Sequence, residues 1–162
     1  MPSLQGHFLI ASPQLNDGNF ARSVVLLVQH NAEGALGVVL NRPSGSTVAD
    51  VWREAVGEPC DCTSPVYVGG PCEGPLMAVH GQPASGGEKV IQGVWFTADG
   101  QELRAVVAGD GPFRLFSGYS GWGGGQLDGE LKVGGWLHLP ATKELVFGDD
   151  EILWERLTRE IG

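Results

Sequence analysis

The chain has 162 residues, the size of one domain, and its 42% apolar and 18% charged residues exclude a disordered chain and a membrane protein. Its formal net charge of −9 argues against a basic nucleic-acid-binding module, because such modules neutralise phosphates with Lys and Arg. The 26 glycines exceed the ordinary share of roughly 7%, which predicts a fold with many turns that need glycine.

Short apolar runs separated by Gly, Pro and Asn predict a chain built mainly of strands. After an apolar entry segment over residues 4–11, two such runs flank a loop that contains Asn31 and Gly34, which predicts an antiparallel hairpin. The strands are predicted over residues 23–28, 35–40, 66–68, 76–80, 93–97, 113–116, 136–139 and 145–147.

Four helices are predicted among these strands. The clearest covers residues 48–56, where apolar residues recur at helical spacing, Ser46-Thr47 can cap the start and Gly57 follows the end. Asp149 and Asp150 suit the positive end of a helix dipole, so the last helix is predicted to begin there. The helices are predicted over residues 48–56, 101–108, 126–131 and 149–161.

These elements fit one α+β domain over residues 1–162. Strands dominate, the helices are short, and no internal repeat or linker interrupts the pattern. The predicted hairpin makes at least part of the sheet antiparallel.

No targeting segment is recognisable at the start of the sequence. The first residues lack a basic stretch, and the longest apolar runs are about five residues, far below the ~20 needed to span a bilayer. We therefore predict a cytoplasmic protein without a membrane partner.

Three cysteines, Cys60, Cys62 and Cys72, lie close together in the sequence, with His80 nearby. These side chains can bind zinc in principle, but structural zinc sites use C-x2–4-C pairs and the C-x-C spacing is tighter. An odd number of cysteines also argues against a disulfide framework. We interpret them as ordinary reduced cysteines, and we predict no metal and no cofactor.

The glycine-rich stretch 118–125, just before Gln126, is the sharpest local motif. Backbone N–H groups of such a turn, followed by a helix, can hold an anion. The stretch lacks the lysine of a phosphate-binding P-loop, however, and Asp128 and Glu130 would repel a phosphate. The interpretation we favour is a sharp strand-to-helix turn with Trp122 in the core.

A second candidate site combines His30-Asn31 with Asn41-Arg42. The first pair lies at the predicted hairpin tip near Glu33, and the second ends the partner strand and is expected to meet the same end of the sheet. An arginine there can bind a carboxylate or phosphate with both of its terminal nitrogens. Alternatively, Arg42 pairs with Asp17 or Glu33, and Asn41 caps a turn before Pro43.

No motif for nucleophilic catalysis is complete. Ser120 in Gly118-Tyr119-Ser120-Gly121 is followed by glycine after one residue rather than two, so the stretch is not G-x-S-x-G. Nothing in the sequence brings a base such as His80 or His138 to a serine. We predict no catalytic residues.

Three stretches together form a recognisable pattern. They are Gly6-His7-Phe8-Leu9-Ile10-Ala11 continuing through Arg22-Ser23-Val24-Val25 to Leu40-Asn41-Arg42-Pro43, then Val66-Tyr67-Val68-Gly69-Gly70-Pro71, and finally Phe116-Ser117-Gly118-Tyr119-Ser120-Gly121-Trp122-Gly123. In order and spacing the chain resembles the YqgE/AlgH family of bacterial proteins across nearly its whole length.

The resemblance implies a compact α+β fold with a curled, mostly antiparallel and barrel-like mixed sheet flanked by short helices. It also implies a regulatory role, including transcriptional regulation, but it brings no settled reaction and no set of catalytic residues. Two positions depart from the family pattern. Cys72 follows Gly-Gly-Pro where an apolar residue such as Val is usual, and Ser120 replaces a common Ala.

We therefore expect a cytoplasmic, non-enzymatic binding or regulatory protein whose partner is another protein or a small ligand. Direct DNA binding is disfavoured by the net charge. The alternative is a hydrolase-type enzyme acting on a small anionic substrate, with His30 and Arg42 in its site. The candidate ligand- or partner-binding residues are His30, Asn31, Asn41, Arg42, Gly69, Gly70, Tyr119, Trp122 and Gln126.

Overall fold

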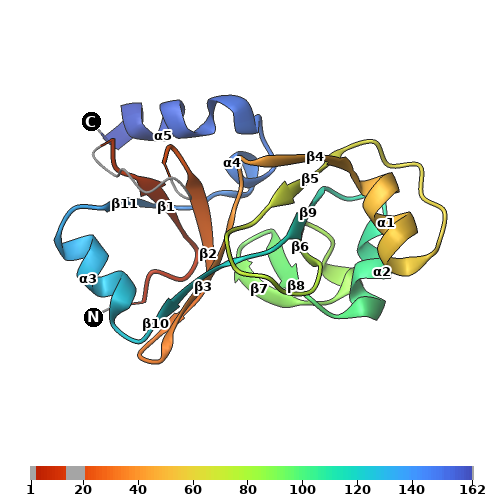
Figure 1. Cartoon of the computed structure of the whole chain (residues 1–162), viewed down its shortest axis with the longest axis horizontal. Helices are drawn as coiled ribbons and strands as arrows, with labels where there is room; N and C mark the ends of the chain where they lie inside the picture. Colours follow the sequence, from red (N-terminus) through yellow and green to blue (C-terminus); the bar gives the residue numbers. More distant parts are fainter. Residues whose placement is uncertain (1–2, 14–20, 162) are drawn as a thin grey trace.

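The computed structural model describes residues 3–13 and 21–161, which form two β-sheets packed against each other (Figure 1). Sheet A contains, in spatial order, β10 (Ser120–Gly123), β3 (Gly34–Val39), β2 (Val24–Asn31), β1 (His7–Ala11) and β11 (Trp136–Pro140). Sheet B contains β4 (Pro43–Thr47), β5 (Pro65–Val68), β9 (Phe113–Ser117), β6 (Met77–His80), β8 (Val94–Thr97) and β7 (Glu88–Ile91). Within the described ranges the β5–β9 pair is parallel and the other pairs are antiparallel.

Helices and short turns of 3-10 helix complete the described part of the chain. The α-helices are α1 (Val48–Val56), α2 (Gly100–Ala108), α3 (Gln126–Lys132), α4 (Lys143–Val146) and α5 (Leu153–Ile161). The 3-10 turns are η1 (Pro83–Ser85) and η2 (Asp150–Ile152). No helix in residues 3–13 and 21–161 is long and apolar enough to cross a bilayer.

Three apolar cores explain why the strands are apolar on both faces. Phe8 and Ile10 of β1 face a central core between the two sheets, whereas Leu9 faces a second core on the outer side of sheet A. Strands buried on both faces read as continuous apolar runs rather than as alternating ones. α3 covers the outer face of sheet A, and α1 and α2 cover the outer face of sheet B, which gives four layers (Figure 1).

The C-terminal helix α5 packs along one side of the central core, beside β1 (Figure 1). Its inward residues Leu153 and Leu157 are buried. Trp154 is partly buried against the same core, and its indole Nε1 donates a hydrogen bond of 2.9 Å to the carbonyl oxygen of Ala11 at the end of β1. The start of α5 is therefore fixed to sheet A by both apolar and polar contacts.

A polar network ties the segment before α5 to sheet B. The hydroxyl of Tyr67 donates to Oδ1 of Asp150 at 2.8 Å and accepts from Nη1 of Arg114 at 2.8 Å. Arg114 also donates through Nη2 to the carbonyl oxygen of Gly148 at 2.6 Å. Burial, followed by the hydrogen bond to Asp150, raises the pKa of Tyr67 to about 12, so the phenol acts as the donor to the carboxylate.

The helices predicted from local signals are confirmed. α1 has the predicted bounds, because the Thr47 side chain accepts from the backbone N–H of Asp50 at its start and Gly57 adopts φ 78° at its end. The helices predicted over residues 101–108 and 126–131 correspond to α2 and α3. The last helix begins later than predicted, because Asp149 caps η2 and α5 starts only at Leu153.

The strand predicted over residues 145–147 is wrong. This segment belongs to α4, which begins where the side chain of Thr142 accepts a hydrogen bond from the N–H of Leu145. The sequence does not predict the strands β4, β7 and β10. They are rich in Ser, Gly or charged residues, and pairing with neighbouring strands rather than intrinsic propensity makes them strands.

The expectation of a curled, barrel-like sheet needs one refinement, because the two sheets do not close into a barrel. The chain passes from sheet A to sheet B between β3 and β4, and it returns between β9 and β10. The glycine-rich stretch predicted as a turn is partly the strand β10, in which Ser120 and Trp122 are buried and the intervening Gly121 is exposed. The α+β class with short helices and mostly antiparallel strands is confirmed.

Candidate functional site

His30 is a buried structural histidine near the hairpin end of β2. Its Nδ1 accepts a hydrogen bond of 2.9 Å from the N–H of Leu4. Its Nε2 lies 3.4 Å from Oδ1 of Asp128 on α3. Only 9% of the residue is exposed, so the ring joins the N-terminal segment, sheet A and α3 instead of facing a ligand.

The neighbouring candidates also make local contacts. Oδ1 of Asn31 accepts from the N–H of Glu33 at 2.8 Å and shapes the hairpin turn. Oε1 of Gln126 accepts from the N–H of Gly123 at 3.0 Å, at the start of α3. Trp122 is 6% exposed and packs edge-on against Trp136 in the outer core of sheet A.

Sequence reasoning missed Glu130 as the polar centre of this outer core. Its Oε1 accepts from the indole Nε1 of Trp122 at 3.2 Å and from that of Trp136 at 2.9 Å. Its Oε2 accepts from Nε2 of Gln126 at 3.3 Å. A carboxylate that receives three hydrogen bonds holds two strands and a helix together.

The expectation that His30 and Arg42 meet at one end of the sheet is wrong. In the β2–β3 hairpin, His30 pairs with Ala35 close to the turn, whereas Val25 pairs with Val39 at the open end. Arg42 follows β3 beyond that open end. An antiparallel partner strand ends beside the start of the first strand and not beside its tip, so the two side chains lie at opposite ends of the hairpin.

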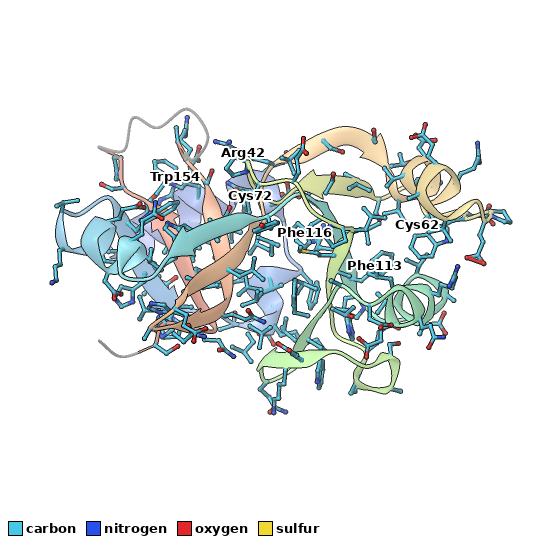
Figure 2. All side chains as sticks on the ribbon, turned by 60° about the horizontal axis from the view of Figure 1, so that its bottom comes forward. Arg42, Cys62, Cys72, Phe113, Phe116 and Trp154 are labelled. Carbon is cyan, nitrogen blue, oxygen red and sulfur yellow. The ribbon has the colours of Figure 1, made fainter. Side chains whose placement is uncertain are left out.

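Asn41 and Arg42 contribute instead to a polar pocket of about 350 Å³ next to the start of α5. Figure 2 shows Arg42 and Trp154 on the same side of the molecule. The pocket, called the polar pocket below, is lined by Ala21, Arg22, Asn41, Arg42, Glu151, Trp154 and Glu155.

Backbone contacts from Asn41 and Arg42 hold one wall of the polar pocket. Oδ1 of Asn41 accepts from the N–H of Val24 at 3.0 Å, and its Nδ2 donates to the carbonyl oxygen of Arg22 at 3.0 Å. Nη2 of Arg42 donates to the carbonyl oxygen of Ala21 at 3.0 Å. The predicted alternative partner Glu33 lies at the other end of the hairpin, and the other one, Asp17, lies outside the described residues.

Arg22 is the most unusual residue of the polar pocket. Its φ is 61°, and among the described residues it is the non-glycine residue with positive φ, a conformation that costs roughly 1–2 kcal/mol. Its guanidinium carbon lies 4.9 Å from the ring centre of Trp154, and its Nη2 lies 3.2 Å from Oε1 of Glu155. Strained backbone that displays a charged side chain is more frequent at functional sites than elsewhere.

Gly69, Gly70 and Tyr119 lie where the chain crosses between the sheets. The carbonyl oxygen of Gly69 accepts from the N–H of Val39 at 2.9 Å and from the hydroxyl of Ser120 at 3.0 Å. A Cβ at Gly69 would collide with the carbonyl oxygen of Gly118, so close backbone approach requires glycine there. These candidates hold the junction together, and the Arg42 carbonyl joins it by accepting from the N–H of Val68 at 2.7 Å.

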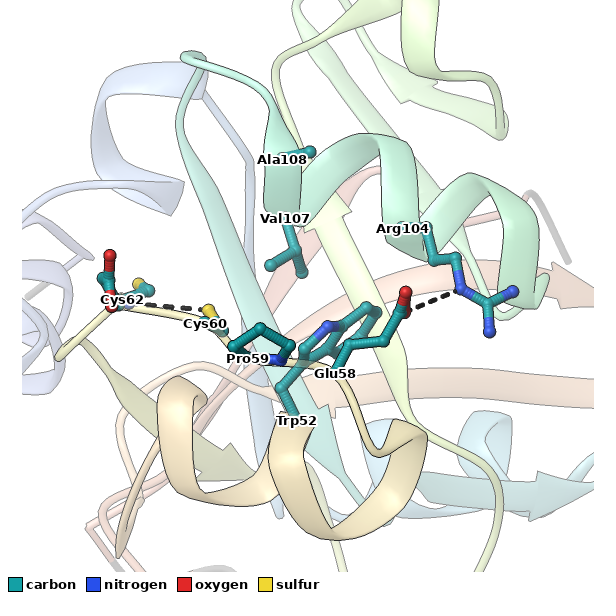
Figure 3. A pocket seen from close by; sticks show the side chains of 9 residues that line it. Trp52, Glu58, Pro59, Cys60, Cys62, Arg104, Val107 and Ala108 are labelled. Atoms are coloured by element: carbon teal, nitrogen blue, oxygen red, sulfur yellow. Dashed lines mark hydrogen bonds and ion pairs between the residues drawn. The ribbon is translucent and has the colours of Figure 1, made fainter.

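The three cysteines lie in two regions, and Figure 2 shows Cys62 and Cys72 in different parts of the molecule. Cys60 and Cys62 line a pocket of about 490 Å³ between α1 and α2, together with Trp52 and the ion pair of Glu58 and Arg104 (Figure 3). The backbone of Cys72 instead pairs with that of Tyr119 in an isolated β-bridge at the sheet junction. A zinc site that uses all three thiols is therefore not formed.

Comparison with known proteins agrees with the fold. A family model described as AlgH-like matches residues 8–162. A UPF0301 protein of Rhodospirillum rubrum is 40% identical over 153 residues, which cover 89% of this chain and 79% of the relative. A UPF0301 protein of Chlorobium luteolum is 35% identical over 165 residues, which cover 97% of this chain and 85% of the relative.

A solved structure gives the same result. The solution structure of the AlgH protein from Pseudomonas aeruginosa superimposes with a TM-score of 0.83 at 32% identity, covering 100% of this chain and 92% of that one. The match by sequence and by structure extends over both sheets and the helices that cover them. The chain belongs to the AlgH-like family.

Proposed function

We propose that this protein is a non-enzymatic, regulatory binding protein of the cytoplasm that takes a small anionic ligand in the polar pocket. The observation that carries the proposal is the guanidinium of Arg22, stacked at 4.9 Å on Trp154 and opposed by one exposed carboxylate, that of Glu155. An arginine held in this way is oriented to bind a carboxylate or phosphate group with both terminal nitrogens.

The ion pair between Arg22 and Glu155 is weak enough to be exchanged. The two side chains are 67% and 55% exposed, and surface pairs of this kind contribute about 0–1 kcal/mol. An anionic ligand can therefore replace the Glu155 carboxylate while Trp154 keeps the guanidinium in place. Glu155 then acts as an internal competitor of the ligand.

The composition of the polar pocket favours binding over catalysis. Its described lining residues include no serine, cysteine or histidine, and of its two carboxylates, Glu151 and Glu155, the second forms the ion pair with Arg22. The hydrolase alternative required His30 beside Arg42, and these residues lie at opposite ends of the hairpin. The net charge of −9 favours a small ligand over DNA.

A titration followed by NMR of the 15N-labelled protein tests this function. Phosphate and citrate are added at constant ionic strength, with glycerol as the uncharged control. We expect saturable shifts of the indole signal of Trp154 and of the backbone signals near Arg22. The Arg22→Gln variant should bind at least about tenfold more weakly, since a charge-assisted hydrogen bond contributes about 1.5–3 kcal/mol.

Two further variants sharpen the result. Glu155→Gln removes the internal competitor and should strengthen binding a few-fold, while Arg53→Gln makes the same charge change as Arg22→Gln at an exposed position of α1, outside the lining of the pocket. Equal binding of phosphate to the wild type and to Arg22→Gln would contradict the proposal. A loss of affinity in Arg53→Gln as large as that in Arg22→Gln would contradict it as well.

A further inference from the structure

A second pocket, called the apolar pocket below, lies at the other end of α5. It has a volume of about 500 Å³, within the range of small-molecule sites. Strand β11, the end of α3, the N-terminal segment and the end of α5 contribute to it. Its lining residues are Leu4, Leu131, Lys132, Trp136, Leu137, His138 and Ile161.

The apolar pocket exposes side chains that a monomer normally buries. Ile161 at the end of α5 is 38% exposed, and Val133, next to the lining residue Lys132, is 83% exposed. Leu131 and Leu137 are half-buried. Large apolar side chains that gather around a concave surface are typical of a ligand site.

Two basic side chains stand among these apolar residues. Lys132 makes no ion pair with a described residue, in a protein whose net charge is −9. Nδ1 of His138 lies 3.3 Å from Nδ1 of His7, and no described residue bonds its Nε2. The contact with His7 thus occupies one ring nitrogen and leaves Nε2 to meet a ligand.

We infer that the apolar pocket binds a small carboxylic acid with an aliphatic or aromatic tail. The tail packs on the more accessible apolar side chains of the lining, Leu131, Leu137 and Ile161, and the carboxylate lies between Lys132 and His138. Charge complementarity with Lys132 selects an acid over a neutral or cationic apolar molecule, and the ring of His138 adds a second polar contact. The apolar wall selects against phosphate and citrate, which have no surface to bury there.

Decanoate is the probe that tests this assignment, with decan-1-ol as the matched molecule without a charge. Both are titrated below their aggregation limits into the full chain, and backbone signals of residues 131–138 are followed by NMR. We expect saturable decanoate binding there and at least about tenfold weaker decan-1-ol binding, because the alcohol lacks the charge-assisted contacts. Equal binding of the two would overturn the carboxylate assignment.

Variants on exposed positions keep the test independent of folding. Lys132→Gln should weaken decanoate binding about five- to tenfold, whereas Lys89→Gln on β7 makes the same charge change elsewhere and should have no effect. Arg22→Gln in the polar pocket should also leave decanoate binding unchanged. Loss of decanoate shifts in all three variants, or in none, would overturn the inference. So would a concentration-dependent dimer that covers residues 131–138 and excludes decanoate.

Discussion

The two ends of α5 have opposite surroundings although both belong to one short helix. At its start, Trp154 and Glu155 meet Arg22 in the polar pocket. At its end, Ile161 meets the half-buried Leu137 in the apolar pocket. Leu153, the first residue of the helix, and Leu157 in its middle are buried in the central core. One face of α5 thus attaches the helix to the central core, and side chains beside that face line a different pocket at each end.

Truncating Leu157, which attaches α5 to the central core, is the change with the largest expected effect. Leu157 is 1% exposed, so Leu157→Ala should lower the free energy of unfolding by about 2–5 kcal/mol. Both pockets should then lose affinity for their probes, because both use α5. Urea unfolding measures the stability, and Ile161→Ala provides the control, with an expected loss below about 1 kcal/mol. A Leu157→Ala protein with unchanged binding at both pockets would show that α5 does not position them.

Removing the hydrogen bonds of the Tyr67 hydroxyl should weaken ligand binding unequally at the two ends of α5. Tyr67→Phe deletes the hydroxyl that joins Asp150 and Arg114, at an expected cost of about 1–3 kcal/mol. Asp150 lies in η2 directly before α5, so the polar pocket should weaken more than the apolar pocket. NMR titrations of the variant with phosphate and with decanoate compare the two effects. Equal weakening at both pockets would count against a local role of the network.

The same hydrogen bonds should make the free energy of unfolding depend on pH in the alkaline range, which unfolding measured at increasing pH can test. The pKa of Tyr67 is raised to about 12 in the folded chain, while the unfolded chain ionises near pH 10. The stabilisation is therefore present below pH 10 and is lost as the pH rises towards 12. Tyr67→Phe should lack this loss.

The stability of the protein should also depend on pH in the acidic range, through the buried side chain of His80. Burial lowers the pKa of His80 below 6.5, because the fully buried ring is charged only at a cost. The unfolded chain takes up this proton first, so stability is complete above pH 6.5 and falls, by up to about 1.4 kcal/mol per pH unit, as the pH drops from 6.5 to the lowered pKa of the folded chain. His80→Asn, whose side-chain oxygen can still accept from the N–H of Gln82, should flatten that slope. An unchanged slope would show that other groups cause the acid sensitivity.

Local signals in the sequence predict much of the fold. Helix α1 is bounded by Thr47 and Gly57, both read from residue type alone, and the β2–β3 hairpin follows from two apolar runs around a polar loop. Strand β10 does not follow, because glycine has low strand propensity and the antiparallel pairing of residues 120–123 with residues 34–37 of β3 makes it a strand. Segment 145–147 is apolar like a strand, but the Thr142 cap makes it helical.

The polar pocket could be predicted only in part. The sequence singles out Asn41 and Arg42 as candidate binding residues, but it predicts them beside His30 instead of beside Arg22 and Trp154. That predicted location is wrong, because the geometry of the hairpin places the end of β3 away from the hairpin tip at His30. Trp154 contacts Arg22 across more than half of the sequence, and no local pattern contains that contact. The positive φ of Arg22 is likewise visible only in the folded chain.

The most direct test of the account is a crossed titration at the two ends of α5. Phosphate and decanoate are each titrated into the wild type, Arg22→Gln and Lys132→Gln, and dissociation constants are taken from NMR shifts. We predict that Arg22→Gln weakens phosphate binding at least about tenfold and leaves decanoate unchanged, and that Lys132→Gln has the reverse pattern. If either variant weakened both ligands equally, or if neither ligand bound the wild type, the ends of α5 would not be two separate sites.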